Sequence, residues 1–156
     1  MSVHRETFTA FVREQEWTRG AELGVDKGIL FGMLLRGCPA LRLLGVDTFP
    51  NKERSKRVFE LAQTYHDRVG LIEMTTQAAS RVVPDNEFDF VFIDADHGYE
   101  AVEDDIKRWK SKVRSGGWLG GHDYHPRKFP GVVKAVDEAF GTRVQHWPGT
   151  IWGVWV

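Results

Sequence analysis

The chain has 156 residues, 21 basic and 22 acidic, and one cysteine. This length suits one domain with one core, so we expect residues 1–156 to form a single domain. The balanced charge argues against a nucleic-acid partner, the hydropathy against a membrane span, and the lone Cys38 against an internal disulfide, which together favour a cytoplasmic protein.

Helical and extended patterns alternate in the first half of the chain. Residues 2–17 place Phe8, Phe11 and Val12 at helical spacing, which predicts an amphipathic helix with Ser2 as its N-cap. The predicted elements that follow are a strand at 21–25, a helix at 29–35, a strand at 41–46, a helix opening at Pro50 and Asn51, a strand at 69–74 and a short helical segment at 75–83. The basic face of the helix after Pro50 is interpreted as solvated surface.

An apolar run at 88–93, interrupted only by Asp89, is the strongest pattern in the sequence. Such a run predicts a strand that is buried on both faces of a parallel sheet. It stops abruptly at Asp94, Asp96 and His97. Ligands of open α/β sheets bind at the carboxyl ends of central strands, so these side chains are candidate site residues; the alternative is that they only cap the next helix.

The remainder continues the alternation. The predicted elements are a helix at 99–113, a glycine-flanked strand in SGGWLGGHDYH that ends at His122, Asp123 and His125, a helix at 130–140, and an antiparallel hairpin over 144–156 that turns at Pro148 and Gly149. Strands alternating with helices throughout predict an α/β fold with a doubly wound sheet.

The first two strand ends carry a candidate cofactor site. The turn after the first strand holds Glu22, Gly24 and Gly28, and a glutamate stands where a dinucleotide-binding turn has its first glycine. A carboxylate is a poor neighbour for a diphosphate and a better one for a cationic cofactor. Asp47, at the end of the second strand, is placed to accept hydrogen bonds from ribose hydroxyls.

Four segments, AELGVDKG, GVDTF, FDFVFIDADHGYEAVEDDIKRW and SGGWLGGHDY, together resemble class I S-adenosylmethionine-dependent methyltransferases. The resemblance is closest to the small-molecule O-methyltransferase branch that includes metal-dependent sugar methylases of antibiotic pathways. It implies a Rossmann-like, doubly wound, seven-stranded sheet, mostly parallel with an antiparallel last strand. It also implies that Glu22 and Gly24 line the methionine end of S-adenosyl-L-methionine, that Asp47 binds the ribose, and that Thr76 and Gln77 lie near the adenine.

The resemblance further implies a divalent metal site. Asp94 matches the first ligand and is also expected to bind the cofactor, and His122 and Asp123 match a polar pair that ends the fifth strand. Relatives usually carry a carboxylate or amide where this chain has His122. Mg²⁺ prefers oxygen ligands, whereas imidazole suits Mn²⁺, Fe²⁺ or Zn²⁺, so either the metal differs, or His122 is not a ligand, or no metal binds.

His97 stands where the sugar methylases carry their proposed base, and its intrinsic pKa near neutrality suits that role. Together with Asp94 it forms the expected catalytic pair, a helix cap being the alternative for His97. The expected reaction is methyl transfer to a hydroxyl of a small acceptor, such as a sugar or natural product. A metal-independent N-methyltransferase, a non-catalytic S-adenosylmethionine-binding module and, more distantly, a NAD-dependent oxidoreductase remain alternatives.

The short chain leaves little room for a lid. The acceptor is expected to be covered by the loop at 124–130, by the N-terminal helix, or by a second subunit in a homodimer. Four aromatic residues near the strand ends are candidates for lining the pocket, with packing as the alternative: Tyr99, Trp118, Tyr124 and Phe129.

Overall fold

The computed structural model describes residues 2–156. Its helices are α1 (Val3–Glu14), α2 (Ile29–Gly37), α3 (Lys56–Thr64), α4 (Thr76–Ser80), α5 (Tyr99–Trp109) and α6 (Pro130–Phe140), with two 3₁₀ turns, η1 (Lys110–Lys112) and η2 (Gly141–Arg143). Its strands are β1 (Arg19–Leu23), β2 (Arg42–Asp47), β3 (Val69–Glu73), β4 (Phe88–Ile93), β5 (Val113–Gly121), β6 (Gln145–Trp147) and β7 (Ile151–Trp155). None of the helices in this part of the chain is long and apolar enough to cross a membrane.

The strands form one sheet in the order β3-β2-β1-β4-β5-β7-β6. Strands β1 to β5 pair in parallel, whereas β7 runs antiparallel to both β5 and β6. This confirms the predicted doubly wound sheet of seven strands with an antiparallel last strand. The strand order reverses between β1 and β4, and a crevice at the carboxyl ends of the strands is expected at this switch point.

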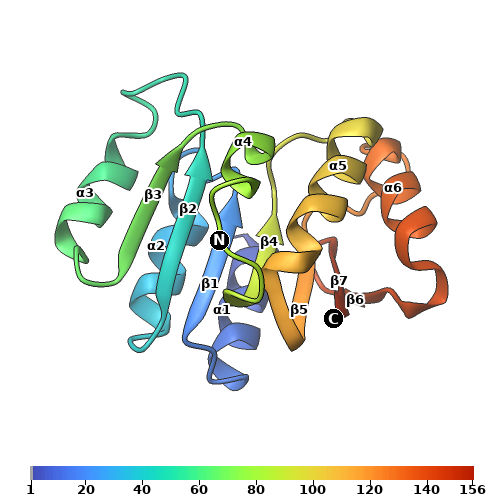
Figure 1. The fold of residues 1–156 in the computed structure, drawn as a ribbon, viewed down its shortest axis with the longest axis horizontal. Helices are drawn as coiled ribbons and strands as arrows, with labels where there is room; N and C mark the ends of the chain where they lie inside the picture. The colour runs from blue at the N-terminus through green and yellow to red at the C-terminus, as the bar shows by residue number, and fades with distance from the viewer. Residues whose placement is uncertain (1) are drawn as a thin grey trace.

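Helices cover both faces of the sheet. In Figure 1, α4, α5 and α6 lie in front of the sheet, and α1 and α2 lie behind it. The two apolar layers follow from the alternation of side chains along buried strands. In β4, Val91 and Ile93 pack in the layer with α5 and α6. Phe90 and Phe92 point the other way and pack with α1 and α2.

Aromatic packing fixes helix α1 against the sheet. The ring of Phe8 lies 4.2 Å from that of Phe92 and 5.3 Å from that of Trp118. Ser2 occupies the predicted N-cap position, but its hydroxyl bonds to His4 Nδ1 at 2.8 Å and makes no capping bond to the backbone. The cap prediction is therefore right in position and wrong in its hydrogen bond.

Several predicted bounds differ from the observed ones, and two of them differ most. The helix expected from Pro50 begins at Lys56, because Asn51 builds a separate turn: its Oδ1 accepts from the Arg54 N–H at 3.0 Å, which competes with helix formation. The helix expected to reach Val113 ends at Trp109, and Val113 instead begins β5.

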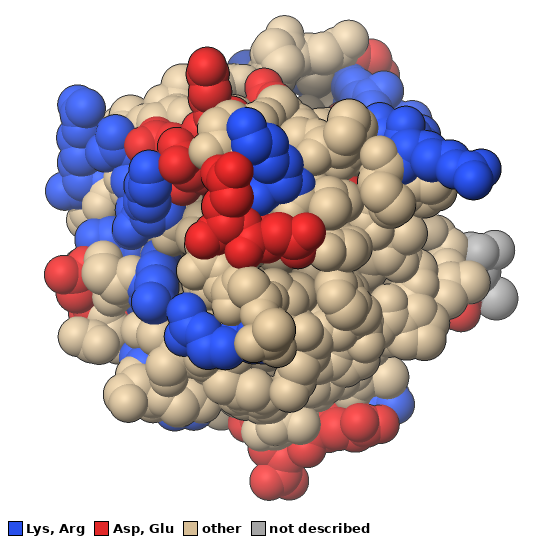
Figure 2. Space-filling view, turned by 90° about the vertical axis from the view of Figure 1, so that its right-hand side faces the viewer, with Lys and Arg blue, Asp and Glu red and all other residues tan. Residues whose placement is uncertain are grey.

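The surface over α5 and α6 has mixed charge. In Figure 2, basic and acidic side chains lie next to one another in the upper left of the face shown. Pairs four residues apart account for part of this pattern, with Arg108 Nε 2.7 Å from Asp104 Oδ2 on α5 and Lys134 Nζ 4.0 Å from Glu138 Oε1 on α6. Exposed pairs of this kind contribute little to stability, so this face is ordinary solvated surface.

Candidate active site

A cleft of about 720 Å³ opens at the carboxyl ends of β1, β2, β4 and β5. This volume is in the range of small-molecule sites. Every residue predicted for the site borders it: Glu22, Gly24, Asp47, Thr76, Gln77, Asp94, His97, His122 and Asp123. The parallel strands thus bring residues that are far apart in the sequence to one edge of the sheet.

Gly24 allows the ends of β1 and β4 to meet. Its φ is +85°, and a side-chain carbon at this position would lie 2.2 Å from the carbonyl oxygen of Asp94. Any other residue would push the two loops apart. The glycine therefore allows Glu22 and Asp94 to lie close together. It also leaves the backbone of this turn open to a ligand.

Glu22 is a buried carboxylate without a protein partner. It is 2% exposed, and its Oε2 has no hydrogen bond within residues 2–156. Burial raises the pKa of Glu22 well above its usual value, the negative charge of Asp94 raises it further, and the positive charge of Arg5 opposes both. A buried charge without a partner is costly, so the position is suited to a ligand that brings a cation or a donor.

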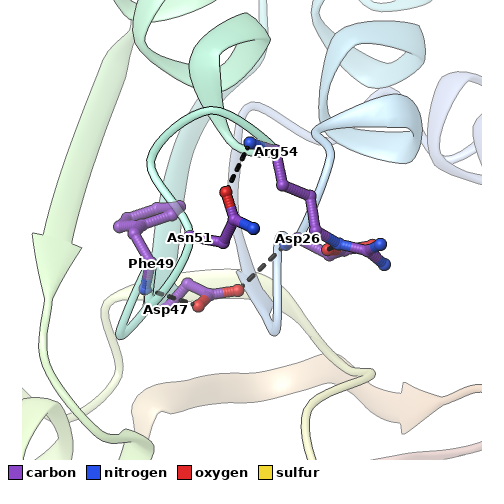
Figure 3. Close-up of polar contacts among 5 residues, drawn as sticks. All are labelled: Asp26, Asp47, Phe49, Asn51 and Arg54. Atoms are coloured by element: carbon purple, nitrogen blue, oxygen red, sulfur yellow. Dashed lines mark hydrogen bonds and ion pairs between the residues drawn. The ribbon is translucent and has the colours of Figure 1, made fainter.

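Asp47 joins the loops that follow β1 and β2 (Figure 3). Its Oδ2 accepts from the Asp26 N–H at 2.9 Å, and its Oδ1 accepts from the Phe49 N–H at 2.8 Å. A bidentate ion pair between Arg54 and Asp26 crosses the same loops. Each carboxylate oxygen retains a free lone pair, so Asp47 can accept ligand hydroxyls while it holds the loops in place.

The far wall of the cleft is built by the start of α4. Thr75 caps this helix, with its hydroxyl accepting from the Ala78 N–H at 3.2 Å. Trp109 of α5 donates from Nε1 to the carbonyl of Thr76 at 3.2 Å. These contacts fix Thr76 and Gln77 at the rim of the cleft, and their place near the adenine stays a prediction.

Asp94, His97 and Asp123 converge at the opposite wall. One ligand atom from each lies within 4.8 Å of the others. His97 Nε2 is 2.6 Å from Asp123 Oδ2. Burial raises the pKa of Asp94, whereas hydrogen bonds and the charges of both histidines outweigh burial and lower the pKa of Asp123. Two carboxylates and one imidazole are a suitable donor set for a divalent transition metal.

His122 lies beside the same carboxylates but faces helix α1. Its Nδ1 is 3.5 Å from Asp94 Oδ1 and 3.2 Å from Asp123 Oδ1, and its ring lies 3.8 Å from that of His4. Burial lowers the pKa of His122, but hydrogen bonds to both carboxylates and their charges outweigh it and raise the pKa to about 9. A protonated imidazole binds no metal, so a ligand role for His122 requires proton loss and stays a prediction.

The four candidate aromatic residues do not border the cleft. Trp118 is fully buried in the layer beneath α1. The hydroxyls of Tyr99 and Tyr124 donate to Glu138 and Asp137, both at 2.6 Å. The ring of Phe129 stacks on His97 with centroids 4.5 Å apart. Phe129, in the loop before α6, thus packs against the His97 imidazole without bordering the cleft. The other three aromatic residues have packing roles, which was the alternative given for them.

Sequence reasoning missed several residues that line the cleft, among them three titratable residues of helices α1 and α5. His4 and Arg5 reach the cleft from the first turn of α1, and Asp105 reaches it from α5. The first two look like polar positions of a surface helix, and Asp105 follows two other acidic residues in an ordinary-looking helix face. Only burial distinguishes Asp105, since it is 1% exposed while neighbouring Asp104 is ion-paired at the surface.

Comparisons with known proteins identify the family and the fold of this chain. The sequence model of a family described as a methyltransferase domain matches residues 21–124, and no curated protein matches the chain. The solved structure of CalS11, a TDP-rhamnose 3'-O-methyltransferase in calicheamicin biosynthesis, superposes with a TM-score of 0.76 at 18% identity, over 95% of this chain and 76% of that one. An O-methyltransferase from Bacillus cereus in complex with SAH superposes with a TM-score of 0.72 at 19% identity, over 95% of this chain and 78% of that one. The O-methyltransferase NovP superposes with a TM-score of 0.73 at 17% identity, over 97% of this chain and 76% of that one.

Proposed function

The chain belongs to the methyltransferase domain family, and from this we propose that it transfers a methyl group from S-adenosylmethionine to a hydroxyl of a small acceptor with the help of a divalent metal. The observation that carries the proposal is the single cleft in which Glu22 and Asp47 lie near the cluster of Asp94, His97 and Asp123. O-methyltransferases of similar fold, one of them in complex with SAH, support it.

The carboxylates of the cleft fit this cofactor better than a dinucleotide. S-adenosylmethionine brings an ammonium group and a sulfonium, which compensate the buried charge of Glu22. Asp47, already oriented by two backbone N–H groups, accepts hydrogen bonds from the ribose. The diphosphate of a dinucleotide would meet carboxylates instead, so a NAD-dependent reaction is disfavoured.

Asp94 and Asp123 fit a divalent cation, because one oxygen from each carboxylate and one ring nitrogen of His97 all lie within 4.8 Å of one another. A bound cation would lower the pKa of an acceptor hydroxyl and orient it. Asp94 and Asp123 would hold it, with His122 as third ligand once its imidazole has lost a proton, which leaves His97 available as the base.

His97 acts as the base in this proposal. It accepts the proton of the acceptor hydroxyl, and Asp123 Oδ2, 2.6 Å from Nε2, stabilises the imidazolium that forms. The acceptor oxygen then forms a bond to the methyl carbon as the carbon–sulfur bond breaks, leaving a neutral thioether. The other residues of the cleft position the reactants, which supplies most of the acceleration of such a transfer.

Calorimetry with S-adenosylhomocysteine tests the cofactor assignment. We expect a dissociation constant in the micromolar range, on the order of −8 kcal/mol, and much weaker binding of NAD. Repeating the titration with Mn²⁺ or Mg²⁺ present tests whether the metal and the cofactor bind together. Undetectable binding of S-adenosylhomocysteine, or tighter binding of NAD, would refute the assignment.

The proposal also covers the class of acceptor, the oligomeric state and the cellular location. We expect a small acceptor rather than a nucleic acid, given the balanced charge of the chain, and a screen of sugars and catechols is the first assay. The homodimer and the cytoplasmic location stay predictions. Light scattering on the purified chain tests the dimer, and a monomer that methylates an acceptor would show that α1 and the loop at 124–130 suffice as a cover.

A further inference from the structure

The Asp47 carboxylate is oriented by two residues whose backbone is left-handed. Asp26 has a φ of +49° and Phe49 a φ of +44°, and the N–H group of each donates to one oxygen of Asp47. Residues other than glycine seldom adopt such φ values, because the side-chain carbon crowds the backbone. The orientation of Asp47 therefore depends on what keeps these two residues in this conformation.

The two left-handed residues are held in different ways. Phe49 is 1% exposed and its ring lies 5.2 Å from that of Phe59, so burial fixes its backbone. Asp26 is exposed, and packing gives it no such anchor. Its carboxylate instead forms the bidentate ion pair with Arg54, in which one oxygen accepts from Nε and the other from Nη2 at 2.7 Å. A planar guanidinium that binds both carboxylate oxygens fixes direction as well as distance.

Arg54 is itself held in a defined turn before α3. Asn51 Oδ1 accepts from the Arg54 N–H at 3.0 Å, and the Asn51 carbonyl accepts from the Ser55 N–H at 3.1 Å. Figure 3 shows the Arg54 side chain reaching from this turn to Asp26 in the loop after β1. A chain of contacts thus runs from Arg54 through Asp26 to Asp47, where the ribose is expected.

We propose that Arg54 is a positioning residue for cofactor binding: it holds the Asp26 carboxylate, keeps the Asp26 N–H directed at Asp47, and so orients Asp47 for the ribose hydroxyls. The inference rests on the proposed function, because it assumes that the ribose of an S-adenosyl compound lies beside Asp47. Arg54 borders the cleft, but its guanidinium is bound to Asp26, and this role requires no contact with the cofactor.

Calorimetry with S-adenosylhomocysteine measures the effect in Arg54→Gln and Arg108→Gln. Arg108 is the matched control, since its guanidinium also binds a partly exposed aspartate, Asp104 at 2.7 Å, but does not border the cleft. We expect Arg54→Gln to raise Kd roughly 2–5-fold, the range for an exposed ion pair, and Arg108→Gln to leave Kd unchanged. The effect of Arg54→Gln should disappear in the Asp47→Ala background, because no carboxylate remains there to be oriented.

Two substitutions of Asp26 separate its backbone conformation from its charge. Asp26→Gly and Asp26→Ala both remove the ion pair, but only glycine adopts a φ of +49° without steric cost. We therefore expect Asp26→Gly to bind S-adenosylhomocysteine roughly 3–10-fold more tightly than Asp26→Ala. Arg54→Gln should have no further effect in the Asp26→Gly background.

Thermal unfolding checks that each variant is folded at the temperature of the titration. An unchanged Kd in Arg54→Gln, an equal loss in Arg108→Gln, or equal affinities of Asp26→Gly and Asp26→Ala would overturn the inference. A loss that persists in the Asp47→Ala or Asp26→Gly background would also contradict it, because Arg54 would then act on the ligand directly. In all these cases the wild type still binds S-adenosylhomocysteine and the cofactor assignment stands, whereas failure of the wild type to bind it would refute both.

Discussion

Replacing Asp47 by alanine separates two roles that the structure gives to one side chain. The substitution removes the acceptors of the Asp26 and Phe49 N–H groups, which are 2.9 and 2.8 Å away. Both bonds lie at or near the surface, so each contributes about 1 kcal/mol, and the free energy of unfolding should fall by about 2 kcal/mol. For a chain of this size that lowers Tm by roughly 4–8 °C.

The same substitution should weaken the binding of S-adenosylhomocysteine by roughly 1–3 kcal/mol, which raises Kd about 5–150-fold, because the ribose hydroxyls lose their acceptor. Calorimetry at 15 °C, well below the lowered Tm, measures this loss with the variant folded. Thermal unfolding without ligand measures the loss of stability separately.

Asp89→Ala is the control for a purely structural effect. Asp89 Oδ2 accepts from the Thr18 and Arg19 N–H groups, both at 2.8 Å, at the opposite end of the sheet and away from the cleft. Asp89→Ala should lower Tm about as much as Asp47→Ala does, and it should leave the affinity for S-adenosylhomocysteine unchanged. Wild-type affinity in Asp47→Ala, or an equal loss of affinity in Asp89→Ala, would refute the assignment of Asp47 to the ribose.

Three further predictions concern the rest of the cleft. His97→Ala should lower the methyl-transfer rate roughly 10²–10⁴-fold and abolish the rise of rate with pH, with S-adenosylhomocysteine affinity nearly unchanged; loss of stability alone would instead assign His97 to a structural role. Asp123→Asn should abolish Mn²⁺ binding measured by calorimetry, and the same loss in His97→Ala rather than in His122→Asn would make His97 the third ligand and not the base. Because burial raises the folded-state pKa of Asp105 from 3.8 to about 6, the carboxyl lowers the free energy of unfolding progressively between these two pH values, and the full cost remains above pH 6. Asp105→Asn should therefore be more stable than the wild type by on the order of 2 kcal/mol at pH 7.5 and by little at pH 4 in denaturant titrations; a variant less stable at both pH values would contradict this.

Much of the fold could be predicted from local pattern. The apolar run at 88–93 is a buried parallel strand, and the hairpin around Gly149 is present with Gly149 at a φ of +84°. These features depend on side-chain periodicity and turn chemistry, which are properties of short segments. The boundary errors at Pro50 and Val113 arose where a side-chain bond and a 3₁₀ turn ended or delayed a helix.

The candidate site was predictable to the extent that it sits at strand ends. Glu22, Asp47, Asp94 and Asp123 follow directly from the alternation of strands and helices, since parallel strands must end at one edge of the sheet.

What the sequence by itself determined, then, was the sheet and the row of carboxylates along its edge. The tertiary structure decided how each is used. It turns His122 toward His4 and places His97 between Phe129 and Asp123. It also buries Asp105 and leaves its Oδ1 without a hydrogen-bond partner among the described residues. Burial, side-chain direction and pKa depend on neighbours that are distant in the chain, so no local pattern carries them.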